Sequence, residues 1–242
     1  MNEQSNQFPR GLADQPASAA FWVLCAPILF QVLAIELLLP VFAVVMQQSE
    51  TNLSVGWLTL SVGGAIQFTL LSVWSQSRMA GGLAGPAFAS PAWLSSAMIL
   101  GPLCLLIPSF TIAQLFPESS GWQYSESVDP AVFEPENWAL GFLVYAVIIA
   151  PVVEEVTFRG VALAALARRG VPVPLAIILS SAAFAGIHLQ YSFAALIVVF
   201  LAGVGFCFIR IASRSMLAAI AAHASANAVM LVIQASASPP PA

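Results

Sequence analysis

Residues 138–170 read WALGFLVYAVIIAPVVEEVTFRGVALAALARRG, an apolar run interrupted near its middle by charged side chains. The run is long enough to cross a bilayer, because the hydrocarbon core needs roughly 20 apolar residues per helix. It nevertheless contains Glu154, Glu155 and Arg159. An ionisable side chain at the centre of a transmembrane helix costs on the order of 2.5–3.5 kcal/mol, so such residues usually face a cavity and serve a function. The stretch therefore predicts a transmembrane helix that carries a polar site.

The composition of the whole chain indicates that its solvent is mostly lipid. Of its 242 residues, 60% are hydrophobic and only 7% are charged, and the mean hydropathy is +0.90. A water-soluble domain has about 25% charged residues. We therefore predict an all-α, polytopic transmembrane helix bundle of about seven spans. The apolar stretches are 21–46, 53–74, 88–116, 138–167, 173–189, 193–211 and 216–233.

The third apolar stretch differs from the others in its prolines. The third stretch is interrupted by Pro91, Pro102 and Pro108, so it could form a re-entrant piece instead of one straight helix.

The chain has no lysine, and its seven arginines form no basic run. Nucleic acid is therefore excluded as a partner.

The arginines predict an orientation, because cytoplasmic loops of membrane proteins carry an excess of basic residues. With a cytoplasmic amino terminus, a seven-span arrangement puts every arginine on the cytoplasmic side. The acidic segment 117–137 and the Ser/Pro-rich tail 234–242 then fall outside. The sequence thus predicts a bacterial cytoplasmic (inner) membrane protein whose site opens towards the exterior. The arginines are Arg10, Arg78, Arg159, Arg168, Arg169, Arg210 and Arg214.

Further polar residues lie in other apolar stretches at helical spacing. The only two histidines of the chain are His188 and His223, and Asn227 follows the second by four residues, so those two share a helix face. Glu155 and Arg159 have the same spacing and can pair, which leaves Glu154 about 100° away around the helix.

Helix lengths bring these residues to a common depth. Counting at about 1.5 Å per residue from the connecting turns places Glu154, His188 and His223 within a turn or two of one another. Pro151 can kink the helix beside Glu154 and admit water. Taken singly, each residue has a structural explanation, either an ion pair between helices or a histidine that bonds a carbonyl. Together they predict one polar layer.

Such a layer suits the hydrolysis of an amide without a covalent intermediate. Glu154 would be the general base for a water that His188 also holds. His223 and Asn227 would donate hydrogen bonds to the oxyanion, a role worth about 10²–10³ in rate per donor. Glu155 would hold the site open or grip a charged part of the substrate, together with its arginine.

A metal cofactor is an alternative to this mechanism. Glu154, His188 and His223 could bind zinc, with a water as the fourth ligand. Asn227 favours the metal-free mechanism, because carboxamides are poor zinc ligands and an oxyanion site uses them well. We therefore expect no cofactor, with zinc as the alternative.

These residues resemble the CPBP family, the CaaX-protease and bacteriocin-processing membrane peptidases also called Abi proteins. That family has three motifs in order, Glu-Glu-x-x-x-Arg, Phe-x-x-x-His and His-x-x-x-Asn, each on its own transmembrane helix. The matching residues here are Glu154, Glu155 and Arg159, then Phe184 and His188, then His223 and Asn227. The resemblance implies a hydrolase, an intramembrane protease acting on membrane-associated or lipid-modified protein substrates. It also implies that the first glutamate and first histidine activate water and the second histidine and asparagine form the oxyanion site.

The resemblance covers residues 138–233, a predicted catalytic core of four spans. Residues 1–137 are predicted to hold an amino-terminal polar segment, about three spans and the acidic segment. Two other functions stay open: an ion- or proton-coupled transporter that uses the same buried groups as a relay, and an inactive immunity or scaffold protein on the same fold. The polar motif has no inverted repeat, and the spacing of Asn227 suits an oxyanion, so both features favour the peptidase.

Overall fold

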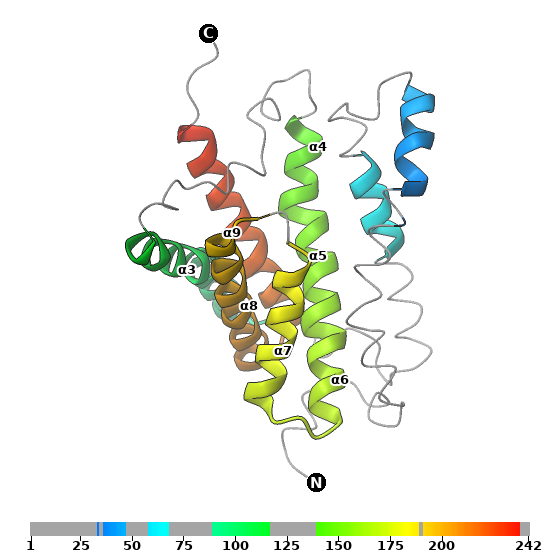
Figure 1. Cartoon of the computed structure of the whole chain (residues 1–242). Helices are drawn as coiled ribbons and strands as arrows, with labels where there is room; N and C mark the ends of the chain where they lie inside the picture. Colours follow the sequence, from blue (N-terminus) through cyan, green and yellow to red (C-terminus); the bar gives the residue numbers. More distant parts are fainter. Residues whose placement is uncertain are drawn as a thin grey trace.

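The computed structural model describes residues 33, 36–46, 58–67, 89–116, 139–188 and 191–237, and within these residues it is helical with no strand. The predicted all-α fold is thus confirmed for this part of the chain. Helices Glu36–Met46 and Leu58–Gln67 come first, followed by the labelled elements of Figure 1. These are α3 (Pro91–Leu115), α4 (Ala139–Val144), the π-helix η7 (Tyr145–Ile149), α5 (Ala150–Glu155), the π-helix η8 (Val156–Ala162), α6 (Leu163–Arg168), α7 (Val173–Gly186), α8 (Phe193–Ser213) and α9 (Met216–Ala237).

Five of these elements form one continuous rod, which we call the α4–α6 rod, from residue 139 to residue 168. Helix α7 runs back beside it in the opposite direction (Figure 1). Gly170 makes this reversal possible, because its φ of +79° lies in the left-handed region that a residue without a Cβ adopts at little cost. A helical hairpin therefore joins the glutamates to the first histidine motif.

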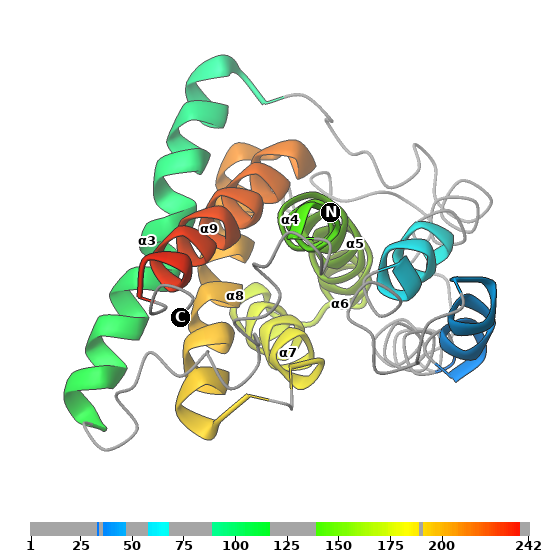
Figure 2. The ribbon, with the colours of Figure 1, turned by 90° about the horizontal axis from the view of Figure 1, so that it is seen from above.

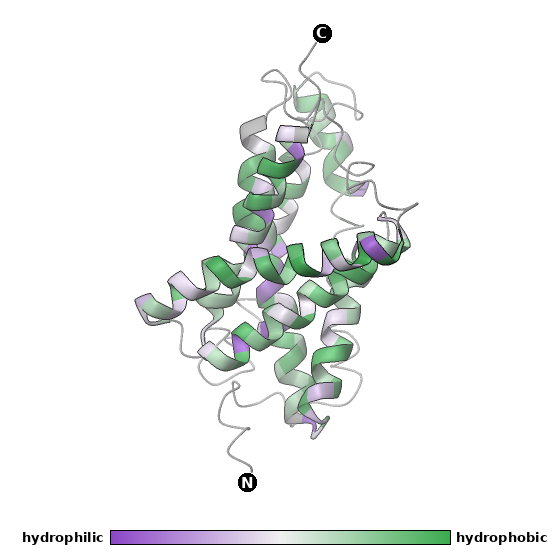
Figure 3. Ribbon diagram, turned by 90° about the vertical axis from the view of Figure 1, so that its left-hand side faces the viewer, coloured by the Kyte–Doolittle hydropathy of each residue, from purple (hydrophilic) through white to green (hydrophobic). Residues whose placement is uncertain are grey.

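Helix α3 is one continuous helix, although Pro102 and Pro108 lie inside it, so the re-entrant alternative is wrong for residues 91–115. It lies steeply across the α4–α6 rod (Figure 3) and packs against α8 and α9 (Figure 2). Gly101 sits at the α9 contact, where an added Cβ would lie only 1.9 Å from the carbonyl oxygen of Ala222. The close approach of α3 to α9 therefore requires glycine at this position.

The protein is an integral membrane protein. Four described helices are long and apolar enough to cross a bilayer: Pro91–Leu115, Gly141–Ala167, Phe193–Ser213 and Met216–Ser236. Large apolar side chains are exposed on their surfaces, such as Ile107 (60%) and Phe208 (60%), and Figure 3 shows apolar residues along the outside of the helices. Soluble proteins rarely expose extended apolar surface of this kind.

The predicted number of seven spans is not confirmed. Helix α7 has only 14 residues, and helices Glu36–Met46 and Leu58–Gln67 are also short. Helix α3 is long enough to span but crosses the rod steeply (Figure 3). Apolar stretches counted along a sequence do not reveal such tilts, because hydropathy does not report direction.

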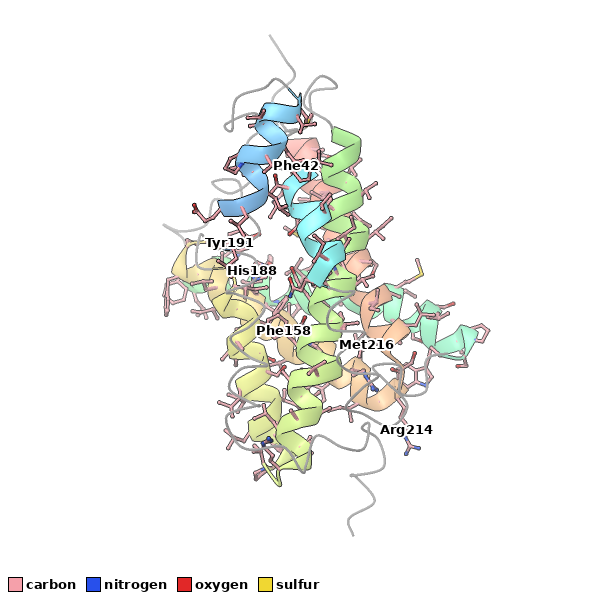
Figure 4. All side chains as sticks on the ribbon, turned by 90° about the vertical axis from the view of Figure 1, so that its right-hand side faces the viewer. Phe42, Phe158, His188, Tyr191, Arg214 and Met216 are labelled. Atoms are coloured by element: carbon pink, nitrogen blue, oxygen red, sulfur yellow. The ribbon has the colours of Figure 1, made fainter. Side chains whose placement is uncertain are left out.

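The structure also corrects part of the argument from the arginines. Arg159 and Arg210 are buried within the bundle, with exposures of 0% and 2%, so they are not loop charges and do not indicate orientation. Arg214 does lie in a connection, between α8 and α9 (Figure 4). Arg10, Arg78 and the acidic segment 117–137 lie outside the described residues, and the orientation itself stays a prediction.

Candidate active site

The two glutamates lie in α5, between the two π-helical segments of the rod. Both are buried, Glu154 to 8% exposure and Glu155 to 0%. Pro151, at the start of α5, has no N–H to continue the backbone ladder, and the turn before it is the wider η7. Wide π-turns inside α-helices occur frequently at functional sites. Local helix irregularity therefore surrounds the carboxylates on both sides.

Glu155 and Arg159 form the predicted ion pair, with 2.9 Å between Oε1 and Nη1. The arginine also donates from Nη2 to the carbonyl oxygen of Gly203 at 3.0 Å. Its guanidinium lies over two aromatic rings, 4.4 Å from the centroid of Phe184 and 5.5 Å from that of Phe206. A buried charge needs such compensation, and these contacts join the rod to α7 and α8.

His223, on α9, lies between the two carboxylates. Its Nδ1 is 2.9 Å from Oε1 of Glu155, and its Nε2 is 3.7 Å from Oε2 of Glu154. Because an ionised carboxylate can only accept a hydrogen bond, Nδ1 carries a hydrogen and Nε2 faces Glu154. The ring of Phe206 stacks on His223, with centroids 4.8 Å apart and planes 20° apart. The imidazole is thus fixed by a hydrogen bond on one nitrogen and by an aromatic face.

His188 is also near this cluster. The sequence placed it on a transmembrane helix, but in the structure it lies just beyond the end of α7. Helix α7 ends at Gly186, and His188 follows in a turn at that end of the helix (Figure 4). Its Nδ1 is 3.0 Å from the carbonyl oxygen of Phe184. The ring of Phe184 makes edge contacts with both histidines, at centroid distances of 5.1 Å to His188 and 5.6 Å to His223. Phe184 therefore packs against both imidazoles.

Asn227 contacts the backbone of the rod. Its Nδ2 donates to the carbonyl oxygen of Ala146 at 2.8 Å. The N–H of Ala150 donates to Tyr145, and Pro151 has no N–H, so neither the fourth nor the fifth residue after Ala146 supplies a backbone donor to this carbonyl. The asparagine side chain takes the place of that donor. One of its two amide hydrogens is used in this way, and the second is left for another acceptor.

The described side chains do not fit the zinc site left open by the sequence. Among the residues that the structure describes, no three His, Cys, Asp or Glu side chains are grouped closely enough to hold a metal ion. The set Glu154, His188 and His223 is therefore not assembled as a three-ligand centre.

Two residues of α8 that support the site were missed by the sequence reasoning. Phe206 stacks on His223, and Gly203 accepts from Arg159. A Cβ at Gly203 would lie 3.2 Å from Nη2 of the arginine and 3.1 Å from Cδ1 of Phe184. Their spacing of three puts them on one helix face, which is the only signal in the sequence. In an apolar helix that signal does not distinguish a packed face from one that faces lipid.

Glu154 also lines a cavity of about 20 Å³ between the rod and helix Leu58–Gln67. Tyr145 of η7 contributes to the same cavity, as do Thr59 and Gln67 of the earlier helix. A void of this volume is large enough to hold one water molecule, for which roughly 10–15 Å³ suffices. The buried carboxylate therefore contacts His223 and also borders a small polar space.

The apolar helical bundle and its buried glutamate–histidine cluster are those of an integral membrane protein with polar residues in its interior. Residues 136–229 match the family model for Rce1-like proteins, described as "type II CAAX prenyl endopeptidase Rce1-like". The matched residues run from the start of α4 into α9 and include every motif residue quoted above, so the resemblance to the CaaX-protease family is confirmed over this stretch. Comparisons with curated proteins and with solved structures gave no match.

Proposed function

We propose that the protein is an intramembrane endopeptidase that hydrolyses a peptide bond of membrane-associated or lipid-modified protein substrates. The observation that carries this proposal is the position of His223 between two buried carboxylates, of which only one is paired with an arginine. Glu155 is neutralised by Arg159 and orients the imidazole. Glu154 has no arginine of its own among the described ion pairs and borders a water-sized cavity. The match to a prenyl endopeptidase family supports the same reaction class.

In the proposed mechanism Glu154 acts as the general base. It takes a proton from a water molecule, and the water oxygen adds to the carbonyl carbon of the scissile bond. The electron pair of the carbonyl moves to its oxygen, which accepts hydrogen bonds from Nε2–H of His223 and from the free amide hydrogen of Asn227. For this step His223 carries a hydrogen on both nitrogens, since Nδ1 already donates to Glu155. Glu154 then delivers its proton to the leaving amine as the carbon–nitrogen bond breaks.

The other motif residues have supporting roles in this proposal. His188 lies at the end of α7, where it is partly exposed and can contact the substrate or the water. Phe184 packs edge-on against both imidazoles and limits their movement. Arg159 and Glu155 hold the rod, α7, α8 and α9 in register around the site. The mechanism needs no metal ion, because Glu154 itself takes the proton of the water.

The test is proteolysis by purified protein reconstituted in liposomes, with a membrane proteome or a lipidated peptide library as substrate. Glu154→Gln keeps the shape of the side chain but removes the base, so we expect no cleavage. Glu36→Gln is the matched control, because Glu36 is an exposed glutamate on helix Glu36–Met46, and it should cleave like the wild type. Cleavage by Glu154→Gln at the wild-type rate would rule out the mechanism. Absence of cleavage by the wild type on every substrate would favour the scaffold or transporter alternatives.

A further inference from the structure

The cavity beside Glu154 has one wall formed by a helix that lies outside the family match. Helix Leu58–Gln67 stands beside the α4–α6 rod (Figures 1 and 2), whereas the match begins at residue 136. The contact is close, because a Cβ on Gly64 would lie 3.0 Å from Cγ2 of Ile149. The wall contributed by this helix consists of Thr59, Leu60, Gly63, Gly64 and Gln67. The amino-terminal part of the chain thus borders the candidate base directly.

Gln67 is the unusual member of this wall. Its side chain is 5% exposed, and no partner in the described part of the chain hydrogen-bonds its amide oxygen Oε1. A buried polar atom without a partner costs about 1–3 kcal/mol, and such atoms in native proteins commonly bind an ordered water. The cavity that Gln67 lines is about 20 Å³, enough for a single water molecule. The unpartnered oxygen of Gln67 and the size of the cavity therefore both indicate one bound water molecule.

The chemistry of the two oxygens makes this water suited to attack a carbonyl. The carboxylate of Glu154 and the amide oxygen of Gln67 are both acceptors. A water between them donates one hydrogen to each, and both of its lone pairs are left free. One lone pair can then face a carbonyl carbon, while the hydrogen on the Glu154 side is the one to be transferred. A donor in place of Gln67 Oε1 would instead occupy a lone pair of the water.

We propose that this cavity is a water site and that Gln67 is a positioning residue, which orients the hydrolytic water against Glu154. The inference rests on the proposed peptidase function, because only hydrolysis requires an oriented water here. It assigns helix Leu58–Gln67 a direct part in the reaction. Residues 136–229 alone therefore lack one wall of the site.

The first experiment compares Gln67→Met with Ile66→Met in the full-length protein. Methionine keeps the length of the side chain but offers no amide oxygen, and Ile66 is the exposed neighbour on the same helix (39%). We expect kcat of Gln67→Met to fall by about 10- to 100-fold with KM unchanged, because a misplaced water slows the step without weakening substrate binding. Ile66→Met should match the wild type. Gln67→Asn, which keeps an acceptor, should recover part of the loss.

The second experiment is independent of activity: a high-resolution structure in lipidic mesophase, which should show one water oxygen within hydrogen-bonding distance of Gln67 and Glu154. The water should be absent from Gln67→Met. A dry cavity, or a substrate backbone or lipid chain in it, would overturn the inference, as would full activity of Gln67→Met. In each case the loss of activity in Glu154→Gln would leave the proposed function standing. If Gln67→Met does not fold, the wild-type density and the kinetics of Gln67→Asn decide.

Discussion

At the scale of single residues, polar side chains hydrogen-bond backbone carbonyls in both π-helical segments of the rod. The carbonyl of Ala146 has lost its donor at Pro151 and receives Asn227 instead. In the second π-segment, the carbonyl of Phe158 accepts from the backbone N–H of Leu163 and also from the hydroxyl of Ser180, at 2.8 Å. In a membrane such carbonyls have no water to bond. Polar side chains of α7 and α9 are therefore fixed to the rod where its helix is irregular.

The pairing of Asn227 with Pro151 gives a prediction that separates structure from chemistry. Asn227→Ala should lower the free energy of unfolding by about 1–3 kcal/mol, because the Ala146 carbonyl loses its donor. Adding Pro151→Ala, which restores an N–H, should recover most of that stability. Under the proposed mechanism the double variant should still be slower than wild type by about 10²–10³, because the oxyanion donor is absent.

Stability is measured by unfolding in detergent, and rate by the liposome assay. Pro151→Ala alone is the control and should keep activity. If Pro151→Ala does not change the effect of Asn227→Ala on stability, the two residues are not coupled. If the double variant recovers both stability and rate, Asn227 is purely a positioning residue.

At the scale of elements, the position of His223 depends on how α9 is seated. Helix α3 packs against α9 through the close contact of Gly101 with Ala222, the residue that precedes His223. Helix α8 supplies Phe206, which stacks on the imidazole ring. The rod then presents both glutamates to His223. The imidazole is thus located by helix packing, to which α3 contributes from outside the family match.

We therefore predict that Gly101→Ala damages the site from a distance. The added methyl would meet backbone at 1.9 Å, which has no flexible side chain to move aside, so α9 must shift. A displacement of about 1 Å can lower the rate of catalysis by roughly 100-fold. Gly186→Ala is the matched control, because a Cβ there meets no atom within 4 Å. Equal activity and equal unfolding midpoints for the two variants would show that α3 does not position α9.

At the scale of the whole molecule, the connections that carry arginine indicate the orientation. The α6–α7 connection follows Arg168 and the α8–α9 connection contains Arg214. Both lie towards the same end of the molecule (Figures 1 and 4). Short loops with basic residues favour the cytoplasmic side. Even without the buried Arg159 and Arg210, the described charges therefore support a cytoplasmic position for these connections.

This orientation predicts which engineered cysteines an impermeant thiol reagent reaches on intact cells. In a variant whose native cysteines are replaced by alanine, Ser125→Cys in the acidic segment 117–137 should be labelled, and Arg214→Cys should not. Permeabilised cells are the control, in which both should react. Labelling of Arg214→Cys alone on intact cells would reverse the orientation and place the acidic segment inside the cell.

The amino-acid sequence alone was enough to predict an integral membrane protein and to identify most residues of the cluster. A chain with 60% hydrophobic and 7% charged residues has to be solvated by lipid, and ionisable residues in such a chain are few enough to identify singly. Helical spacing then predicted the ion pair of Glu155 with Arg159, which the structure confirms. The family motifs point to the same residues.

The arrangement of these residues could be seen only in the folded chain. The fold placed His223 between the two glutamates, put His188 beyond the end of α7, gave Asn227 a backbone partner, and brought Phe206 and Gln67 to the site. The physical reason is that membrane helices are apolar on every face, so periodicity does not distinguish a packed face from one in lipid. Contacts such as that of residue 67 with the cavity beside residue 154 depend on helix tilt and close packing at glycine, and hydropathy along the chain does not report either.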